Sequence, residues 1–326
     1  MNIGLYDVDS HNFPNLALMK ISAWHKAQGD NVEFVDIQCP IKHYDKVYIS
    51  KIFGEEYSKM ADYLPNADEI VFGGTGFAIT IENGREVYHK DRDPNLPYEV
   101  EHIYPDYSLY PEFTNGKAYG FLTRGCCNNC GFCLASKKEG LCSVKVANLS
   151  EFWRGQKEIV LLDANLLACK DKMELLRQLA DSGAWVDFTQ GLDARFFTVE
   201  VAQALNFIKK KVVHFAFDFM KNEKAIVRGL NIYCDYCKSN DKDSVYILTN
   251  FDTTIEEDLY RMRKVQETGL LPDIRIYRKH TAPRILRDLQ RWCNNRVLYR
   301  SCDFMDYVPR SDGKSVRELY FSGGEL

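Results

Sequence analysis

The feature that most constrains the fold is an alternation of apolar, β-rich runs with helical patterns between residues 118 and 300. Apolar residues at helical spacing separate the runs, as in KMELLRQLADSG, TVEVAQALNFIKK, EEDLYRMRKVQETG and PRILRDLQRWCNN. Each right-handed βαβ unit adds its strand on the same side, so six units predict an α/β fold with a partial, TIM-like (βα)6 barrel. The six runs are 118–123 (AYGFLT), 159–164 (IVLLDA), 185–190 (WVDFTQ), 212–219 (VVHFAFDF), 245–251 (VYILTNF) and 273–278 (DIRIYR).

A shorter alternation comes before this region. Strands are expected at 1–9, 31–37 and 69–74, with a helix that ends at Gly29 and a second helix over 55–64 (EEYSKMADYL). This β-α-β-α-β order predicts a small doubly wound, Rossmann-like domain. The expected divisions of the chain are this domain at 1–81, a linker at 82–117, the barrel core at 118–300 and a C-terminal extension at 301–326.

The linker over 82–117 contains four prolines and many aromatic residues without a sustained period. Disordered segments normally lack aromatic residues. We therefore expect this linker to wrap over its neighbours and pack against them.

Composition limits the classes of function. Hydrophobic residues make up 45% of the 326 residues, charged residues 27%, and the net charge is -4, which gives no general reason to expect a nucleic-acid or membrane partner. No uncharged stretch is longer than 70–81, which is far shorter than the roughly 20 apolar residues of a membrane span. The start, MNIGLYDVDS, lacks a secretory signal. We expect a soluble cytoplasmic protein, in which the eleven cysteines stay reduced.

Four of those cysteines lie in TRGCCNNCGFC at 123–133, where the first predicted strand of the barrel ends. Cys126, Cys130 and Cys133 have the spacing C-x3-C-x2-C, whereas Cys127 does not fit it and is interpreted as a neighbour. Three thiolates on one loop can bind three irons of a 4Fe–4S cluster and leave the fourth iron without a protein ligand. Parallel α/β folds build their sites at this end of the strands. The spacing therefore predicts a cluster with an open iron.

This loop, with the aromatic Phe132 before its last cysteine, resembles the radical S-adenosylmethionine (SAM) superfamily, whose six-unit part-barrel also matches 118–300. The resemblance implies that Cys126, Cys130 and Cys133 bind the cluster and that SAM binds its open iron. It also implies an enzyme that cleaves SAM reductively to a 5′-deoxyadenosyl radical, which removes hydrogen from the substrate. An electron donor such as flavodoxin or ferredoxin is the partner that this chemistry needs.

Polar side chains follow the later strands of the predicted barrel. Burying this many polar groups without hydrogen-bond partners at one end of the barrel would be costly. A polar ligand is therefore expected there. Each of them alone is better explained as a helix cap or a solvated loop residue, and residues 252–254, ahead of IEEDL at 255–259, look like an N-cap. The set is Asp163, Asn165, Gln190, Asp193, Arg195, Asp218, Asn250, Asp252, Tyr277 and Arg278.

Similar LLDxN, QGLDAR and FAFD patterns in radical SAM relatives imply roles for these residues. Asp163, Asp193 and Asp218 are the implied catalytic residues. The GGE motif that binds the amino group of SAM in many relatives is replaced by DAN at 163–165, so Asp163 and Asn165 are both candidates for that role. The GGE at 323–325 is not that motif. The residues implied to bind SAM are Phe132, Asn165, Gln190, Arg195, Asp218 and Asn250.

Radical SAM enzymes with an N-terminal doubly wound domain resemble a cobalamin-dependent branch, and VFGGTGF at 71–77 looks like that branch. One type of cobalamin domain uses the histidine of D-x-H-x-x-G. Here DSHNFP places Asp9 and His11 in register but has Pro14 where the glycine belongs. The domain is also short, so we expect a retained scaffold and no bound cobalamin.

The opening at 7–30, DVDSHNFPNLALMKISAWHKAQGD, is similar to enzymes with queuine lyase activity. They split the 7-deazaguanine base queuine into its cyclopentenediol and a smaller base, preQ1, for salvage. Such a substrate carries a secondary ammonium and a diol, which carboxylates can bind. The expected substrate is therefore a small, modified purine-like base, and the carboxylates available for it are Asp163, Asp193, Asp218 and Asp252.

The rival enzyme hypothesis is radical modification, such as methylation, of RNA or protein. Arg284, Arg287 and Arg291 recur at helical spacing, with Arg296 and Arg300 beyond them, and they could bind phosphate. Such a row is more often the solvated face of an amphipathic helix. No β-rich RNA-binding domain follows the barrel, so nucleic acid is the less favoured partner.

The remaining alternative is zinc. CNNC or CGFC could join Cys234 and Cys237 of CDYC in a four-cysteine site, which would allow a zinc-stabilised binding module without catalysis. The two pairs lie roughly 100 residues apart, and Cys126 would have no role. We therefore interpret Cys234 and Cys237 as packing residues. The scattered Cys142, Cys169, Cys293 and Cys302 are interpreted as buried hydrophobic residues.

Overall fold

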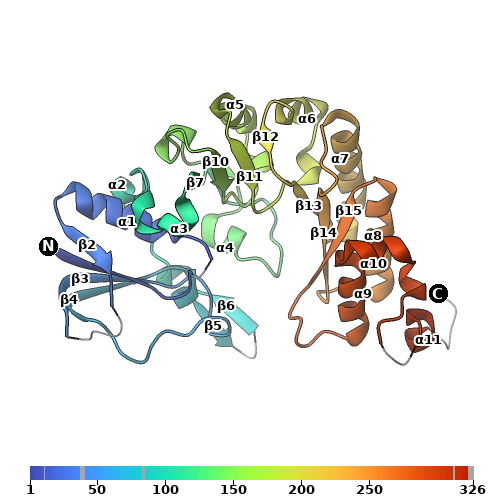
Figure 1. Ribbon diagram of the computed structural model, residues 1–326, viewed down its shortest axis with the longest axis horizontal. Helices are drawn as coiled ribbons and strands as arrows, with labels where there is room; N and C mark the ends of the chain where they lie inside the picture. The colour runs from blue at the N-terminus through green and yellow to red at the C-terminus, as the bar shows by residue number, and fades with distance from the viewer. Residues whose placement is uncertain (11, 37–40, 83–84, 311–312, 322–326) are drawn as a thin grey trace. The chain divides into compact units, whose positions relative to one another are not determined.

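The computed structural model describes residues 1–10, 12–36, 41–82, 85–310 and 313–321. The chain divides into two compact units, residues 1–163 and 164–326, and each is described by itself (Figure 1). Both units contain parallel strands and helices, so the predicted α/β class is confirmed. The described strands form no closed barrel. The boundary at 163/164 lies inside the expected core of 118–300, and the finer domain division remains a prediction.

The first unit begins with a parallel sheet in the order β2-β1-β3-β4. On one face, Ile3 and Leu5 of β1 are fully buried against Leu18 and Ile21 of the helix α1. This helix begins where the Asn15 side chain accepts a hydrogen bond from the Leu18 amide at 3.2 Å. The elements are β1 (Asn2–Asp7), α1 (Leu16–Ala27), β2 (Asn31–Phe34), β3 (His43–Ser50) and β4 (Asn66–Gly73).

The predicted helix over 55–64 is wrong. The chain makes a single turn there, in which the Gly54 carbonyl accepts hydrogen bonds from the Tyr57 and Ser58 amides, and no helix follows. The segment is held at its start because the buried Asp9 carboxylate accepts hydrogen bonds from the Ile52 and Phe53 amides. The strand β3, which sequence analysis missed, pairs with both β1 and β4. The sheet is therefore parallel but lacks the second helix of a doubly wound domain.

The segment expected to be a linker forms short elements. Its tyrosines bind other parts of the first unit, since the Tyr107 hydroxyl donates to the Phe152 carbonyl at 2.6 Å and the Tyr110 hydroxyl donates to Asp7. Just before this segment lie η1 (Thr75–Ala78) and β5 (Ile79–Glu82), and its own elements are β6 (Arg85–Tyr88), η2 (Lys90–Arg92), α2 (Tyr98–Glu101), η3 (Tyr107–Leu109) and α3 (Pro111–Thr114).

The last part of the first unit carries the cysteine loop. Strands β7 and β10 are parallel neighbours, and β8 pairs with β9 in the antiparallel sense. The elements are β7 (Lys117–Gly120), β8 (Thr123–Arg124), α4 (Ala135–Glu139), β9 (Val144–Lys145), η4 (Leu149–Glu151) and β10 (Glu158–Leu161).

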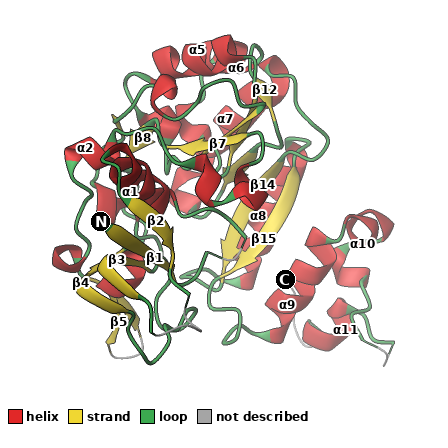
Figure 2. Cartoon of the chain, turned by 60° about the vertical axis from the view of Figure 1, so that its left-hand side comes forward, coloured by secondary structure: helices red, strands yellow, loops and turns green. Residues whose placement is uncertain are grey.

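The second unit contains a parallel sheet in the order β13-β14-β15 and a short parallel pair, β11 and β12. Helix α8 packs against β14 and β15, and α9 packs against β15 (Figure 2). With β7 and β10, these strands confirm all six predicted strand positions. The elements up to β13 are η5 (Leu166–Ala168), α5 (Lys172–Ser182), β11 (Trp185–Phe188), η6 (Ala194–Phe196), α6 (Val199–Leu205), β12 (Lys209–Lys210) and β13 (His214–Ala216).

The remaining part of the second unit is helical apart from β14 and β15. Helix α8 begins at a capping box, in which Thr254 accepts from the Glu257 amide and Glu257 accepts from the Thr254 amide. The expected helix start ahead of IEEDL is thereby confirmed. The elements are η7 (Met220–Asn222), α7 (Glu223–Tyr236), β14 (Ser244–Thr249), α8 (Ile255–Glu267), β15 (Leu271–Ile276), α9 (Arg284–Asn294), α10 (Arg296–Ser301), η8 (Phe304–Asp306) and α11 (Val316–Tyr320).

A buried arginine joins the ends of two strands in this unit. Arg261 of α8 is 0% exposed, and its guanidinium donates to the Phe217 carbonyl at 2.7 Å and to the Leu248 carbonyl at 2.8 Å. Its charge is paired with Asp258. These bonds satisfy strand-end carbonyls that would otherwise be buried without partners.

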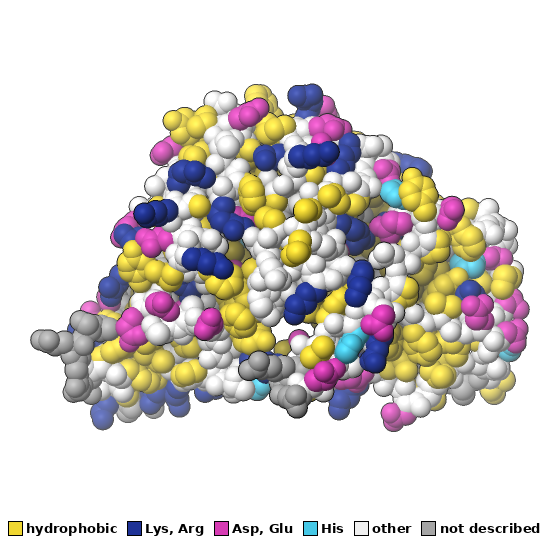
Figure 3. All heavy atoms as spheres, turned by 180° about the vertical axis from the view of Figure 1, so that it is seen from behind, with side chains coloured by type: hydrophobic (Ala, Val, Ile, Leu, Met, Phe, Trp, Pro, Cys, Tyr) yellow, Lys and Arg dark blue, Asp and Glu magenta, His cyan; other side chains and the backbone are white. Residues whose placement is uncertain are grey.

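No helix among the described residues is long and apolar enough to cross a membrane. On the face drawn in Figure 3, basic and acidic side chains both occur over much of the surface. This mixture agrees with the small net charge of -4.

Gly229 provides a test of the packing in the second unit. A Cβ at Gly229 in α7 would lie 1.8 Å from the Ala194 carbonyl oxygen, so Gly229→Ala should lower the free energy of unfolding by about 1–3 kcal/mol despite the better helix propensity of alanine. Urea unfolding measures the change. Gly73→Ala is the control, since a Cβ there meets no atom within 4 Å. Equal stability of the two variants would contradict the close approach of α7 to η6.

Candidate functional site

The cysteine loop connects β8 to the helix α4. Cys126 is buried, Cys130 and Cys133 are half-buried, and Cys127 is exposed. None of the described cysteines is in a disulfide. All four side chains of this loop therefore keep thiol chemistry, and the three with the C-x3-C-x2-C spacing are the more sheltered ones.

Backbone amides of the loop point at two of the predicted ligand sulfurs. The Asn128 amide donates to Cys126 Sγ at 3.5 Å, and the Ala135 amide donates to Cys133 Sγ at 3.5 Å. Hydrogen bonds to the sulfurs of an iron–sulfur cluster tune its reduction potential. The donor set is thus chemically suited to iron.

The thiols are not assembled into a metal site in this structure. Among the described residues, no three His, Cys, Asp or Glu side chains are grouped so that they could hold a metal ion. Metal ligands often reach their final geometry only with the metal bound, because binding and ordering are coupled. Cys126, Cys130 and Cys133 therefore fit a cluster by chemistry and sequence position, and their assembly around it remains a prediction.

The base of the loop is closed by an ion pair that sequence analysis missed. Arg124, just before the loop, has NH1 2.8 Å from Glu139 Oε1 and NH2 3.1 Å from Glu101 Oε1. The Gly125 amide also donates to Glu139, and the Cys126 amide donates to the Gly140 carbonyl at 3.1 Å. The two ends of the loop are therefore held together.

Gly125 is required at its position. Its φ is +90°, a conformation that other residues rarely adopt, and a Cβ would lie 2.1 Å from the Cys142 carbonyl oxygen. Any side chain there would push apart the two ends of the loop.

The loop is also tied to the segment at 75–93. Lys138 Nζ lies 3.2 Å from Asp93 Oδ2 and donates to the Thr75 hydroxyl. Asp93 accepts a second hydrogen bond from the Tyr88 hydroxyl at 2.8 Å. No sequence motif identified Lys138 or Asp93. The Arg124–Glu139 pair could have been predicted, because these two opposite charges lie just before and just after the cysteine loop.

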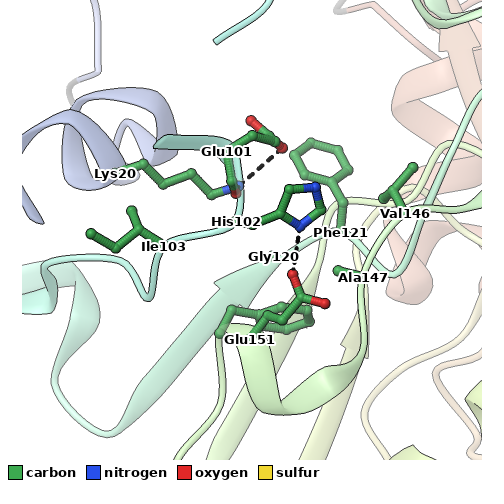
Figure 4. A pocket seen from close by; sticks show the side chains of 10 residues that line it. Lys20, Glu101, His102, Ile103, Gly120, Phe121, Val146, Ala147 and Glu151 are labelled. Atoms are coloured by element: carbon green, nitrogen blue, oxygen red, sulfur yellow. Dashed lines mark hydrogen bonds and ion pairs between the residues drawn. The ribbon is translucent and has the colours of Figure 1, made fainter. Parts of the chain in front are cut away.

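A hollow beside the end of β7 is lined by charged side chains that pair with each other (Figure 4). Lys20 Nζ lies 3.0 Å from Glu101 Oε1, and His102 Nδ1 lies 2.8 Å from Glu151 Oε2. Burial lowers the pKa of Lys20, although the neighbouring Glu101 opposes this shift. The pairs link α1, α2 and η4, which is a structural role.

Asp163, a predicted catalytic residue, is 5% exposed and takes hydrogen bonds from the chain just before the cysteines. It accepts from the Leu122 amide at 3.2 Å, from the Thr123 amide, and from the Thr123 hydroxyl at 2.6 Å. Burial raises the pKa of Asp163 to about 6, although these hydrogen bonds act in the opposite direction. This side chain positions the start of the loop.

In the second unit, three residues predicted to bind SAM or substrate lie together. The Asn165 side-chain amide donates to Asp193 Oδ2 at 2.9 Å, and Arg195 Nε donates to Asp193 Oδ1 at 2.9 Å. Burial favours protonation of Asp193, but the Arg195 guanidinium outweighs it and lowers the pKa of Asp193. The cluster therefore keeps a half-buried carboxylate ionised.

The other predicted residues of this unit lie at strand ends or in loops. Asp218 accepts from the Leu248 amide at 3.1 Å, and burial raises its pKa. Asn250, at a φ of 62°, donates through its side chain to the Tyr277 carbonyl at 2.7 Å. Gln190 and Asp252 are exposed. Asn250 is thus a residue that joins the ends of β14 and β15.

Cysteines outside the loop differ in their burial. Burial raises the pKa of Cys234 to about 11 and that of Cys293 to about 12, which works against the thiolate that zinc needs. Cys169 is buried as expected, whereas the expectation for Cys142 is wrong, since it is exposed. Packing therefore remains the better explanation for Cys234 and its neighbour Cys237.

Two expectations fall outside the described residues, namely those for His11 and for the GGE at 323–325. Asp9, which shares the cobalamin-like pattern with His11, is used structurally by the loop after β3. No protein-family model and no curated protein matches the chain.

The pKa of Asp163 predicts a pH dependence of stability. Because the folded-state pKa is raised from 3.8 to about 6, the contribution of Asp163 to stability is largest below pH 4 and decreases as the pH rises through 6. Asp163→Asn cannot ionise, so its stability relative to the native protein should increase by roughly 3 kcal/mol between about pH 4 and pH 7. Urea unfolding at several pH values measures the difference. A difference that does not change with pH would contradict the shifted pKa.

Proposed function

We propose that the protein is a radical SAM enzyme in which Cys126, Cys130 and Cys133 bind a 4Fe–4S cluster. The observation that carries the proposal is the C-x3-C-x2-C loop, which has reduced thiols, lies at the carboxyl end of β7 and β8, and is closed at its base by Arg124 and Glu139. When bound, such a cluster supplies the electron that cleaves SAM to a carbon-centred radical. The six-strand part-barrel expected from the sequence belongs to the same proposal.

The residues of the first unit prepare the loop for three thiolates. Amides of Asn128 and Ala135 donate to the sulfurs of Cys126 and Cys133, as amides do to the sulfurs of bound iron–sulfur clusters. Asp163 holds the backbone at 122–123, so the loop starts from a fixed point. These contacts reduce the part of the loop that must become ordered when metal binds.

The second unit supplies a polar cluster suited to a small ligand with hydroxyl or ammonium groups. Asp193 is kept ionised by Arg195 and oriented by Asn165, so it can accept charge-assisted hydrogen bonds. Asp218 has a pKa raised by burial and is suited to hold a proton. Asp163 is buried and holds the start of the cysteine loop. Asp193 also accepts hydrogen bonds from Asn165 and Arg195, but Asp193 and Asp218 are less buried, so they are the better candidates for substrate contacts.

The proposed substrate is the 7-deazaguanine base queuine, split by lyase chemistry to the smaller base preQ1. Its secondary ammonium and diol match the ionised Asp193 and the other carboxyl groups of the second unit. The proposed setting is the cytoplasm, with a flavodoxin or ferredoxin as electron donor. Radical modification of RNA or protein is the second candidate.

The cysteines test the cluster assignment. After anaerobic reconstitution with iron and sulfide, the native protein should contain about four irons, absorb in the iron–sulfur region and form 5′-deoxyadenosine from SAM under reduction. Cys130→Ala should lose the absorbance and the deoxyadenosine. Cys127→Ala is the matched control, since it removes an exposed thiol from the same loop and should keep both signals. Full retention by Cys130→Ala, or binding of one zinc in place of iron, would overturn the proposal.

Deoxyadenosine formation also tests the substrate. Mass spectrometry should show that queuine stimulates turnover more than other 7-deazapurine bases, their nucleosides or tRNA, with preQ1 as the product. Asp193→Asn should raise the queuine concentration needed for half-maximal turnover by at least about tenfold, because a charge-assisted hydrogen bond is lost. Stimulation by tRNA in the absence of any response to queuine would favour RNA modification.

A further inference from the structure

The helices α9 and α10 carry five exposed arginines, Arg284, Arg287, Arg291, Arg296 and Arg300. None of their side chains forms an ion pair or hydrogen bond with another residue in the part of the chain that the structure describes. Other basic groups of the chain are paired with acidic ones, as Lys264 is with Glu267. The five guanidinium groups of α9 and α10 have no such pair among the described residues.

Helical geometry places these arginines in two short rows. Arg284, Arg287 and Arg291 stand three and four residues apart, so they lie on the same side of α9. The opposite side is buried, through Leu286, Leu289 and Trp292 among others. Arg296 and Arg300 are four residues apart on α10, whose N-cap Asn295 directly follows α9.

Aromatic contacts and a short connection hold α9 and α10 against each other. The Trp292 and Tyr299 rings lie 5.1 Å apart, and Trp292 also lies 5.4 Å from Phe304. Figure 2 shows α9, α10 and α11 grouped near the C-terminus. We call the surface formed by the five arginines the arginine face.

The surroundings of the arginine face contain little negative charge. Residues 275–300 include eight Lys and Arg but only one acidic residue, Asp288. Asp288 is buried at 8% exposure and accepts a hydrogen bond from the Tyr320 hydroxyl at 2.6 Å, with Arg310 at 3.8 Å. Its charge is therefore directed inward, and the outer surface of α9 is strongly positive in a protein with a net charge of -4.

We infer that the arginine face binds the phosphate backbone of a nucleic acid. Guanidinium groups match phosphate oxygens with two parallel hydrogen bonds, and arginine is the side chain best suited to this geometry. An acidic protein partner fits less well, because protein interfaces are depleted of charge at their centre and use buried aromatic or apolar contacts there. On α9 the large apolar side chains are turned inward, and surfaces that bind nucleic acid are the more polar and more positive kind.

The inference does not rest on the proposed radical chemistry. Phosphate binding needs neither the cluster nor SAM, so it can be measured on the full-length protein without reduction. A failure of cluster formation would leave it untouched, and a failure of nucleic-acid binding would leave the cysteine assignment untouched.

Fluorescence anisotropy tests the inference with three labelled probes, a single-stranded RNA, an RNA hairpin and a DNA duplex. The double variant Arg287→Glu, Arg291→Glu is compared with the control Arg177→Glu, Lys224→Glu, which reverses two exposed charges on α5 and α7 and changes the net charge equally. The native protein should bind at least one probe, with an affinity that falls as salt rises. The α9 variant should bind that probe at least about tenfold more weakly at low salt, with a salt dependence reduced by about two ions.

The control variant should bind within about twofold of the native protein at equal salt, because its changed charges lie on other helices. The probe that binds best identifies the class of nucleic acid. Unchanged circular dichroism shows that the α9 variant is folded, and Arg287→Gln, Arg291→Gln replaces it if it is not. Three results would overturn the inference. The control could weaken binding as much as the α9 variant does, or the native protein could bind none of the probes. The third is that Arg287 and Arg291 are needed for binding an acidic protein but for no nucleic-acid probe.

Discussion

The candidate site depends most on the hydrogen bonds that the buried Asp163 side chain accepts. It accepts hydrogen bonds from the backbone at residues 122 and 123, directly before the cysteine loop, and so links the chain after β10 to the chain after β7. The Arg124–Glu139 pair then closes the loop that these bonds start. Without both, the metal that we propose for the loop would have to order more of it on binding, at a larger entropic cost.

The polar residues of the second unit follow the same principle. Asn165, Asp193 and Arg195 satisfy one another, so their burial costs little before any ligand arrives. Asn250 and Arg261 instead use their donors on strand-end carbonyls. Polar side chains near strand ends thus divide into those that bind backbone carbonyls, such as Asn250 and Arg261, and those that bind other side chains, such as Asp193. Only the tertiary contacts distinguish the two kinds.

Much of the fold could be predicted because periodicity reflects burial. The six strands and the helices α5, α6, α8 and α9 match runs of apolar residues with clear periods. The failures have physical causes. The pattern at 55–64 suits a helix, but it turns once and ends, because Asp9 and the chain after β3 hold its start in another conformation. The strand β3 was missed since lysine, aspartate and tyrosine interrupt its apolar alternation.

The sequence by itself determined the α/β class, the strand positions and the spacing of three cysteines, because these depend on residue types at fixed intervals. Only the tertiary structure decided that Asp163 binds backbone amides, that Arg195 keeps Asp193 ionised and that five arginines of α9 and α10 have no side-chain partner within the described parts of the chain. Those properties arise from residues distant in the chain, and the charge state of a group depends on its burial and on the neighbours that folding brings to it.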